Sequence, residues 1–437
     1  MKEKILFKSV HAILPCEKDF ITCDILVNTS SGVIEKIGKN LSTGDQIEVN
    51  NEYSYKYVMP GFIDPHVHFR FPGKPEVENW FTGSKAALAG GVTTILEMPN
   101  NNPPIINKEA LSIKIDHVKS HSLINYGLFG GLTSSNFSFL VETPEIKAIK
   151  VYLASTTGSL LLENIESLEL ASSPKPVVFH SEDETIIQNN SKKYGPLKTI
   201  MEHSLIRSKE AAISSTKKII ENHNRSGGNF HIAHISTPEE IEMLKNSKIS
   251  FEVAPHHIFF SIENYRNQFL WKCNPPLRDK ESADRLYTFL LKEEIPMIAT
   301  DHAPHPIENK QFKENYEPAS GIPSLEVGSH LILSEMFQKK ISPIYAAKIL
   351  ATNTAERFSI EKRGAIKEGY FADLTFINHE KWTMKQNDIY SGSGWSPFLG
   401  SNFEGKICAT MVNGKMYKIK ELIELNTPPE SRKIFNI

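Results

Sequence analysis

Residues 58–70 read VMPGFIDPHVHFR, a short apolar run followed by histidines at positions 66 and 68. The run has the length and apolar character of a buried strand. In an extended segment, residues two apart point to the same side, so His66 and His68 would face one point. Polar donors at the carboxyl end of a buried strand are typical of the catalytic end of a (β/α)8 barrel.

Further short apolar segments follow, and helical segments alternate with them. The expected strands are 93–99, 148–154, 176–180, 230–236, 250–257 and 296–304, and the expected helices include 78–90, 203–224, 238–247 and 281–293. Strand–helix alternation over about 300 residues is typical of a (β/α)8 barrel of the TIM type. The α/β fold class is therefore predicted.

The two ends of the chain have a different character. Residues 1–57, 365–377 and 406–418 mix short β-like runs with turn residues, and Asn413-Gly414 is a hairpin turn signal. We therefore expect residues 1–57 and 362–437 to form one small β-sandwich-like domain, and residues 58–361 to form the barrel.

The composition limits the possible functions. Of 437 residues, 40% are hydrophobic and 23% are charged, and the net charge is −2. These values exclude a disordered chain, and they give no basic surface for nucleic acid or membrane. No apolar stretch approaches the roughly 20 residues that cross a bilayer. The four cysteines, Cys16, Cys23, Cys273 and Cys408, are far apart, which favours reduced thiols in the cytoplasm.

Five of the expected strands end in, or contain, a side chain with a nitrogen or oxygen donor atom. In chain order these are the His-x-His pair, Lys150, His180, His234 and Asp301. Taken singly, each has an ordinary structural explanation, such as a buried histidine, a lysine that snorkels, or an aspartate in a turn. Together they fit two divalent ions, since imidazole and carboxylate suit zinc. His66, His68 and Asp301 would hold one ion, and His180 and His234 the other. Lys150 carboxylated by CO2 would be the bridging anion.

Eight segments resemble the dihydroorotases of the amidohydrolase superfamily, of the long-chain bacterial type. They are MPGFIDPHVHFR, MPNNNPP, IKVYLAS, FHSED, HIAHIS, EVAPHH, NPPLR and ATDHAPH, spread over residues 59–305. The resemblance implies two zinc ions and a carboxylated Lys150. It also implies reversible hydrolysis of (S)-dihydroorotate to N-carbamoyl-L-aspartate, the third step of pyrimidine (UMP) biosynthesis. Asp301 would act first as general base and then as general acid.

The expected substrate contacts begin with Arg70, which is two residues past His68 and suits a ring carboxylate. The resemblance adds Asn100 and His305 at the carboxylate, Asn274 at the ring amides, and the Ser320-Gly321 backbone over the ring. It also adds Thr156 or Thr157, in a loop that either contacts the substrate or is a plain solvent loop. The chain departs from the family pattern at Phe71, Asn101 and Ser324.

Two other interpretations stay open. Allantoinase or another cyclic amidase would share every metal ligand, but Arg70 and the NPPLR segment disfavour it. A non-catalytic, dihydroorotase-like scaffold subunit would be expected to lose ligands, whereas every ligand position is filled here. By analogy with the superfamily we expect a homodimer.

Overall fold

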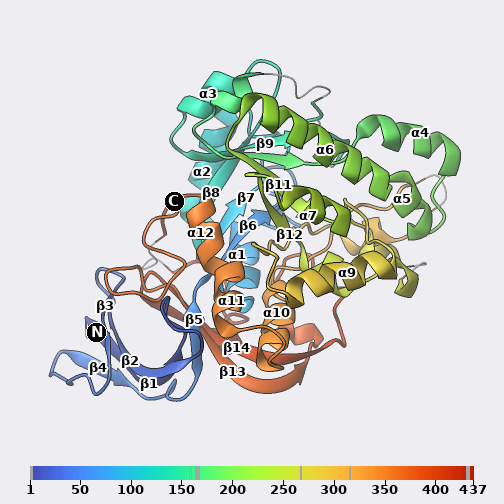
Figure 1. Ribbon diagram of the computed structural model, residues 1–437. Coiled ribbons are helices and arrows are strands. Elements are labelled where there is room, and N and C mark those ends of the chain that lie inside the picture. The colour runs from blue at the N-terminus through green and yellow to red at the C-terminus, as the bar shows by residue number, and fades with distance from the viewer. Residues whose placement is uncertain are drawn as a thin grey trace.

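The structure is a computed structural model that describes residues 3–156, 158, 160–162, 168–265, 268–313, 316–429 and 434–437. It contains two β-sheets, one at the centre of a ring of helices and one built from the two ends of the chain (Figure 1). Across these described ranges, no helix is long and apolar enough to span a membrane.

The central sheet has seven parallel strands in chain order, from β6 to β12. They are β6 (Phe62–Val67), β7 (Val92–Glu97), β8 (Asn125–Gly131), β9 (Ile146–Tyr152), β10 (Val177–His180), β11 (Phe230–Ile235) and β12 (Ser250–Val253). Two parallel bridges, Val253 to Ile298 and Val67 to His302, place residues 298–302 between β12 and β6. The ring is thereby closed, and the predicted (β/α)8 barrel is confirmed.

Helices surround the strands (Figure 1). They are α1 (Trp80–Ala89), α2 (Lys108–His121), α3 (Phe137–Glu142), α4 (Glu184–Tyr194), α5 (Ile200–Ile206), α6 (Lys209–Ser226), α7 (Pro238–Leu244), α8 (Pro255–Phe259), α9 (Lys280–Leu291), α10 (Gly328–Phe337), α11 (Pro343–Ala347) and α12 (Asn353–Arg357). Asn79 and Thr237 begin α1 and α7 with reciprocal capping boxes, which satisfy otherwise unpaired backbone N–H groups.

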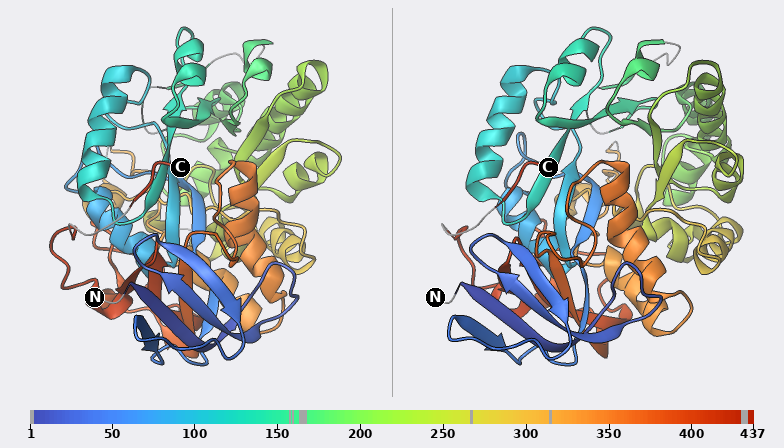
Figure 2. Two further views of the ribbon diagram at one scale, coloured as in Figure 1. Left: turned by 90° about the vertical axis from the view of Figure 1, so that its left-hand side faces the viewer. Right: turned by 60° about the vertical axis from the view of Figure 1, so that its left-hand side comes forward.

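The second sheet joins both ends of the chain, and the blue and red strands lie side by side in Figures 1 and 2. Its strands are β1 (Lys4–Ala12), β2 (Ile21–Asn28), β3 (Val33–Gly38), β4 (Ile47–Asn50), β5 (Tyr57–Pro60), β13 (Leu374–Thr383), β14 (Asn402–Val412) and β15 (Lys415–Lys418). β5 lies between β1 and β13, so it joins the N-terminal strands to the C-terminal ones. Asn413 and Gly414 have φ values of 49° and 80°, as the expected hairpin turn requires.

Several element predictions were wrong in detail. The strand expected over 250–257 ends at Val253, because Pro255 begins α8. The helix expected over 203–224 is divided into α5 and α6 at Arg207 and Ser208. The segment 296–304 makes isolated bridges and no continuous strand. The glycine-rich strand β8 and the helix α2 were not expected.

Candidate active site

The predicted donors meet at the carboxyl ends of the barrel strands. One pocket is lined by His66, His68, Arg70, Asn100, Lys150, Tyr152, Thr156, His180, His234, Asn274, Asp301, Ala303, Ser320 and Gly321. The structure therefore brings together the six predicted donors, which lie between residues 66 and 301 and come from five strand positions of the barrel.

His66, His68 and Asp301 form the first donor group, whose ligand atoms all lie within 4.8 Å of one another. The Nε2 atoms of His66 and His68 lie 3.4 and 3.1 Å from Asp301 Oδ1. The other ring nitrogens are engaged elsewhere: His66 Nδ1 lies 2.6 Å from Glu252 Oε1, and His68 Nδ1 lies 2.7 Å from Asn100 Oδ1. Hydrogen bonds at Nδ1 orient both rings with Nε2 toward the pocket, as in histidines that bind metals.

His180 and His234 form the second donor group. His180 Nδ1 lies 2.9 Å from His234 Nε2, and His180 Nε2 lies 2.8 Å from Glu182 Oε2. Burial lowers the pKa of His66, His68, His180 and His234. This shift favours the neutral form of the four rings, which is the form that binds a metal ion.

Lys150 stands in the same pocket on β9, with 0% of its surface exposed. Its Nζ atom has no hydrogen-bond partner among the described residues. Burial lowers the pKa of this amine, although Glu252 and Asp301 oppose the change. Burial therefore makes the charged form of this amine less favourable than it is in water.

Two of the donors have an uncommon backbone conformation. His234 has a φ of 37° and Asp301 a φ of 49°, in the left-handed region that residues other than glycine seldom adopt. Such conformations persist where the surrounding structure enforces them, and they are concentrated at functional sites. The unusual backbone therefore supports a functional role for these two strand ends.

The expected substrate contacts are only partly gathered in this pocket. Arg70, Asn100, Asn274, Ser320, Gly321 and Thr156 line it. His305 lies outside that lining but next to Arg70: its Nε2 is 3.2 Å from Arg70 Nη2 and 2.9 Å from the Ser320 carbonyl oxygen. Thr157 lies outside the described residues.

The sequence did not single out several residues that hold these side chains in place. Glu252 contacts both His66 and His231. His203 Nε2 lies 2.9 Å from Asn274 Oδ1. Tyr152 lines the pocket, and its buried hydroxyl group has no hydrogen-bond partner in the described part of the chain.

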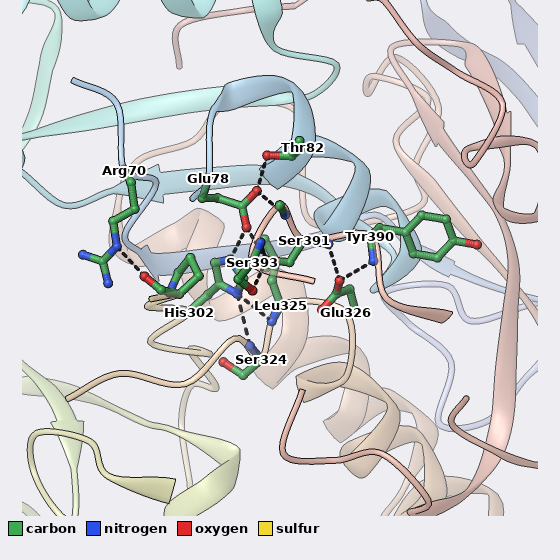
Figure 3. Close-up of polar contacts among 12 residues, drawn as sticks. Arg70, Glu78, Thr82, His302, Ser324, Leu325, Glu326, Tyr390, Ser391 and Ser393 are labelled. Carbon is green, nitrogen blue, oxygen red and sulfur yellow. Dashed lines mark hydrogen bonds and ion pairs between the residues drawn. The ribbon is translucent and has the colours of Figure 1, made fainter. Parts of the chain in front are cut away.

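A further set of hydrogen bonds, centred on Glu78, holds His302, the residue next to Asp301. The buried carboxylate of Glu78 accepts hydrogen bonds from Thr82, Ser391, the Gly392 N–H and His302 Nε2 (Figure 3). The carbonyl oxygen of His302 in turn accepts the N–H of His68 at 2.7 Å. Residues 391–392 belong to the connection between β13 and β14. The C-terminal part of the chain therefore contacts Glu78, which in turn contacts His302 next to Asp301. The neighbouring His-Ala-Pro-His motif gave no signal for this role.

His256, His257 and Cys273 are a second buried cluster with ligand atoms within 4.8 Å of one another. Here His257 Nε2 and Cys273 Sγ both contact the Pro275 carbonyl oxygen, at 3.0 and 3.2 Å. These two side chains already hold the backbone beside Asn274, and the structure gives them that structural role.

The comparisons with known proteins agree with this geometry. Residues 57–417 match the family described as "Amidohydrolase family". A dihydroorotase from Methanosphaera stadtmanae is 33% identical over 401 residues, which are 88% of this chain and 91% of the relative. A dihydroorotase from Pyrococcus furiosus is 31% identical over 418 residues, which are 94% and 93% of the two chains.

Among solved structures, an L-hydantoinase (dihydropyrimidinase) from Arthrobacter aurescens has a TM-score of 0.85. The alignment covers 94% of this chain and 95% of the hydantoinase chain at 21% sequence identity, which shows a shared fold. The strand-end donors, the match over residues 57–417 and the sequence relatives lead to one assignment: this chain belongs to the amidohydrolase family and, within it, to the dihydroorotases.

Proposed function

We propose that this chain catalyses the reversible hydrolysis of dihydroorotate to N-carbamoyl-aspartate. It is a hydrolase of cyclic amides, in agreement with the dihydroorotases that it resembles over most of its length. The observation that carries the choice of substrate is the place of Arg70, whose guanidinium lines the same pocket as the metal-donor residues. A planar guanidinium binds a carboxylate with two parallel hydrogen bonds, and dihydroorotate carries a carboxylate on its ring.

The donor residues fit two zinc ions. His66, His68 and Asp301 would hold one, and His180 and His234 the other, while Lys150 carboxylated by CO2 would bridge them. The buried Nζ of Lys150 has no hydrogen-bond partner among the residues that the structure describes, which supports this role, because a carbamate would turn this amine into a metal ligand. Bound zinc would supply an activated water and polarise the ring carbonyl.

The protein's own groups account for proton transfer and for substrate binding. Asp301 would take a proton from the attacking water and give it to the leaving ring nitrogen. Asn274 would hydrogen-bond the ring amides, and the backbone of Ser320 and Gly321 would cover the ring. A Cβ atom at Gly321 would lie 2.2 Å from the Ala303 carbonyl oxygen and 2.9 Å from His305, so this wall requires glycine.

The second candidate is another cyclic amidase, because hydantoinases share the fold. Those enzymes act on rings without the carboxylate that Arg70 would bind. The scaffold interpretation is disfavoured, since all six proposed ligand positions line one pocket. The homodimer and the cytoplasmic location stay predictions.

The test compares dihydroorotate, allantoin and dihydrouracil as substrates of the zinc-loaded protein and of Arg70→Met. A buried charge that loses its partner costs about 3–5 kcal/mol, so kcat/KM for dihydroorotate should fall about 10²–10³-fold. Zinc content should not change. Lys74→Met, which removes an exposed charge from the same loop, should behave like the wild type.

The outcomes separate the alternatives. If the wild type prefers allantoin or dihydrouracil, the substrate assignment is wrong, although the fold and the family are unaffected. If Arg70→Met reduces turnover of all three rings equally, Arg70 has a structural role and the carboxylate pocket lies elsewhere.

A further inference from the structure

We infer that a buried network of Glu97, Lys114 and Asn101 positions Arg70, and thereby sets the affinity for a ring carboxylate without contacting the substrate. Glu97 ends β7, Lys114 lies on α2, and Asn101 is in the loop between them. The inference rests on the proposed function, because it assigns the carboxylate of the substrate to Arg70.

The network forms hydrogen bonds with the backbone on both sides of Arg70. Asn101 Nδ2 donates to the Phe69 carbonyl oxygen at 2.8 Å. Lys114 Nζ donates to the Phe71 carbonyl oxygen. The two carbonyl groups that flank Arg70 in the chain are therefore both held by side chains of this network.

The side chains of Asn101 and Lys114 both contact the carboxylate of Glu97. Lys114 Nζ lies 2.8 Å from Glu97 Oε2, and Asn101 Nδ2 lies 3.2 Å from Glu97 Oε1. The side chains of Lys114 and Glu97 are both 0% exposed. Because Glu97 is a residue of the barrel sheet, the loop that carries Arg70 is fixed to the rigid part of the fold.

The other end of Arg70 is held separately. Its Nε donates to the Pro304 carbonyl oxygen at 2.7 Å, and its Nη2 lies 3.2 Å from His305 Nε2. On the outer side of the loop, the Phe71 ring stacks on His117 of α2 with 3.5 Å between ring centroids. A side chain fixed at both ends loses little freedom when it binds, which favours affinity.

Stability alone gives no reason for an ion pair at this place. Taking two charges out of water is unfavourable, and well-packed apolar residues often stabilise a core as well as a buried pair does. The pair does supply what apolar residues lack, a donor for the Phe71 carbonyl and an acceptor for Asn101. Two positions at which the chain departs from the family pattern, Phe71 and Asn101, take part in this arrangement.

The test uses Glu97→Gln/Lys114→Met, which removes both charges and leaves no unpaired ion. A side chain displaced by about 1 Å can cost about 10²-fold, so we expect KM for dihydroorotate to rise about 10- to 100-fold. Both kcat and zinc content should stay within about threefold of the wild type, which a general loss of structure would not allow. Lys108→Met, at an exposed position of α2, is the matched control.

A double-mutant cycle tests whether the network acts through Arg70. In the Arg70→Met background, the Glu97→Gln/Lys114→Met change should add almost nothing to the loss already caused. If the two losses multiply, the network acts elsewhere and the inference is wrong. A wild-type KM in a folded double variant would also overturn it.

Two controls keep the result interpretable. If the double variant does not fold, Asn101→Ala is used in its place. It removes the hydrogen bonds to the Phe69 carbonyl and to Glu97 Oε1 but keeps the Glu97–Lys114 ion pair, so KM should rise by a smaller factor. An unchanged KM would overturn the inference. Failure of the wild type to hydrolyse dihydroorotate would refute the proposed function instead, so the two failures are distinguishable.

Discussion

Lys150 places an amine in the pocket that the other five proposed ligands line. It is buried among histidines and carboxylates, and its Nζ has no hydrogen-bond partner within the described ranges. A carbamate at this position would place an anion between the group of His66, His68 and Asp301 and the pair of His180 and His234, which is the role that we propose for this lysine.

At this scale we predict that Lys150→Ala loses most bound zinc and most turnover. Acetate or propionate should restore part of both, because a free carboxylate can occupy the space left by the side chain. Metal analysis and dihydroorotate hydrolysis with and without the acid measure this effect. Lys147→Ala, three residues earlier on β9 and bonded through Nζ to the Ser359 carbonyl, should change neither quantity. Full zinc content in Lys150→Ala would contradict the bridging role.

The junction between α5 and α6 shows how elements hold the site. Arg207 leaves the end of α5, and its guanidinium contacts the Glu182 carboxylate and the Ser155 carbonyl oxygen, with Nε 2.9 Å from Glu182 Oε2. Glu182 in turn orients His180. Burial by itself raises the pKa of the Glu182 carboxyl, but Arg207 and His180 outweigh it and hold this pKa well below its usual range.

This arrangement predicts a pH signature. Because the folded-state pKa of Glu182 is lowered, its stabilisation is fully present above the unfolded pKa of about 4.3 and is lost as the pH falls toward the folded value. Arg207→Met leaves the buried Glu182 carboxylate without its cationic partner and should lower the free energy of unfolding by about 3–5 kcal/mol at neutral pH. The difference between the two proteins should shrink as the pH falls through 4.

Thermal unfolding of metal-free protein between pH 2 and 8 measures this difference. The pair change Glu182→Gln/Arg207→Met should recover most of the loss, and Arg225→Met on the exposed face of α6 should have little effect. A loss that is the same at pH 2 and pH 8 would show that Arg207 acts through packing alone.

The same elements show where sequence reasoning succeeds and where it fails. The order of the strands follows from the apolar runs in the sequence. The active sites of (β/α)8 barrels lie at the carboxyl ends of the strands, so the polar residues at those ends, including the cluster around Asp301, were predictable as well. The break at Arg207 was not, because the helical pattern continues through it and the break depends on contacts with Glu182 and Ser155. Partners such as Glu252 and Glu97 were also hidden, since their roles require knowledge of which strands and helices are neighbours.

For the whole molecule, zinc should be part of the stability of the fold. Ligands that bind only the folded state stabilise it by about 2.7 kcal/mol at 100 times the dissociation constant. We therefore expect the Tm of metal-free protein to rise steadily with free zinc. His234→Ala should show a smaller rise, because one of the two proposed sites loses a ligand.

Thermal melts over a zinc series, with magnesium as the comparison, test this expectation. Magnesium prefers oxygen ligands and an octahedral geometry, so it should raise Tm much less at sites built mainly from imidazole. An equal rise with both ions would indicate weak surface binding rather than occupancy of the strand-end pocket.

The pairing of β5 with β1 and β13 also constrains how the chain is made on the ribosome. Roughly 310 residues separate Pro60 from Leu374, and their translation at about 5–20 residues per second takes about 15–60 s. Throughout that interval the nascent chain carries five of the eight strands of its terminal sheet, with an open backbone edge along β5. A chain released before residue 374 would therefore offer that edge to other strands, and premature termination would give an aggregation-prone product even where much of the barrel had already been made.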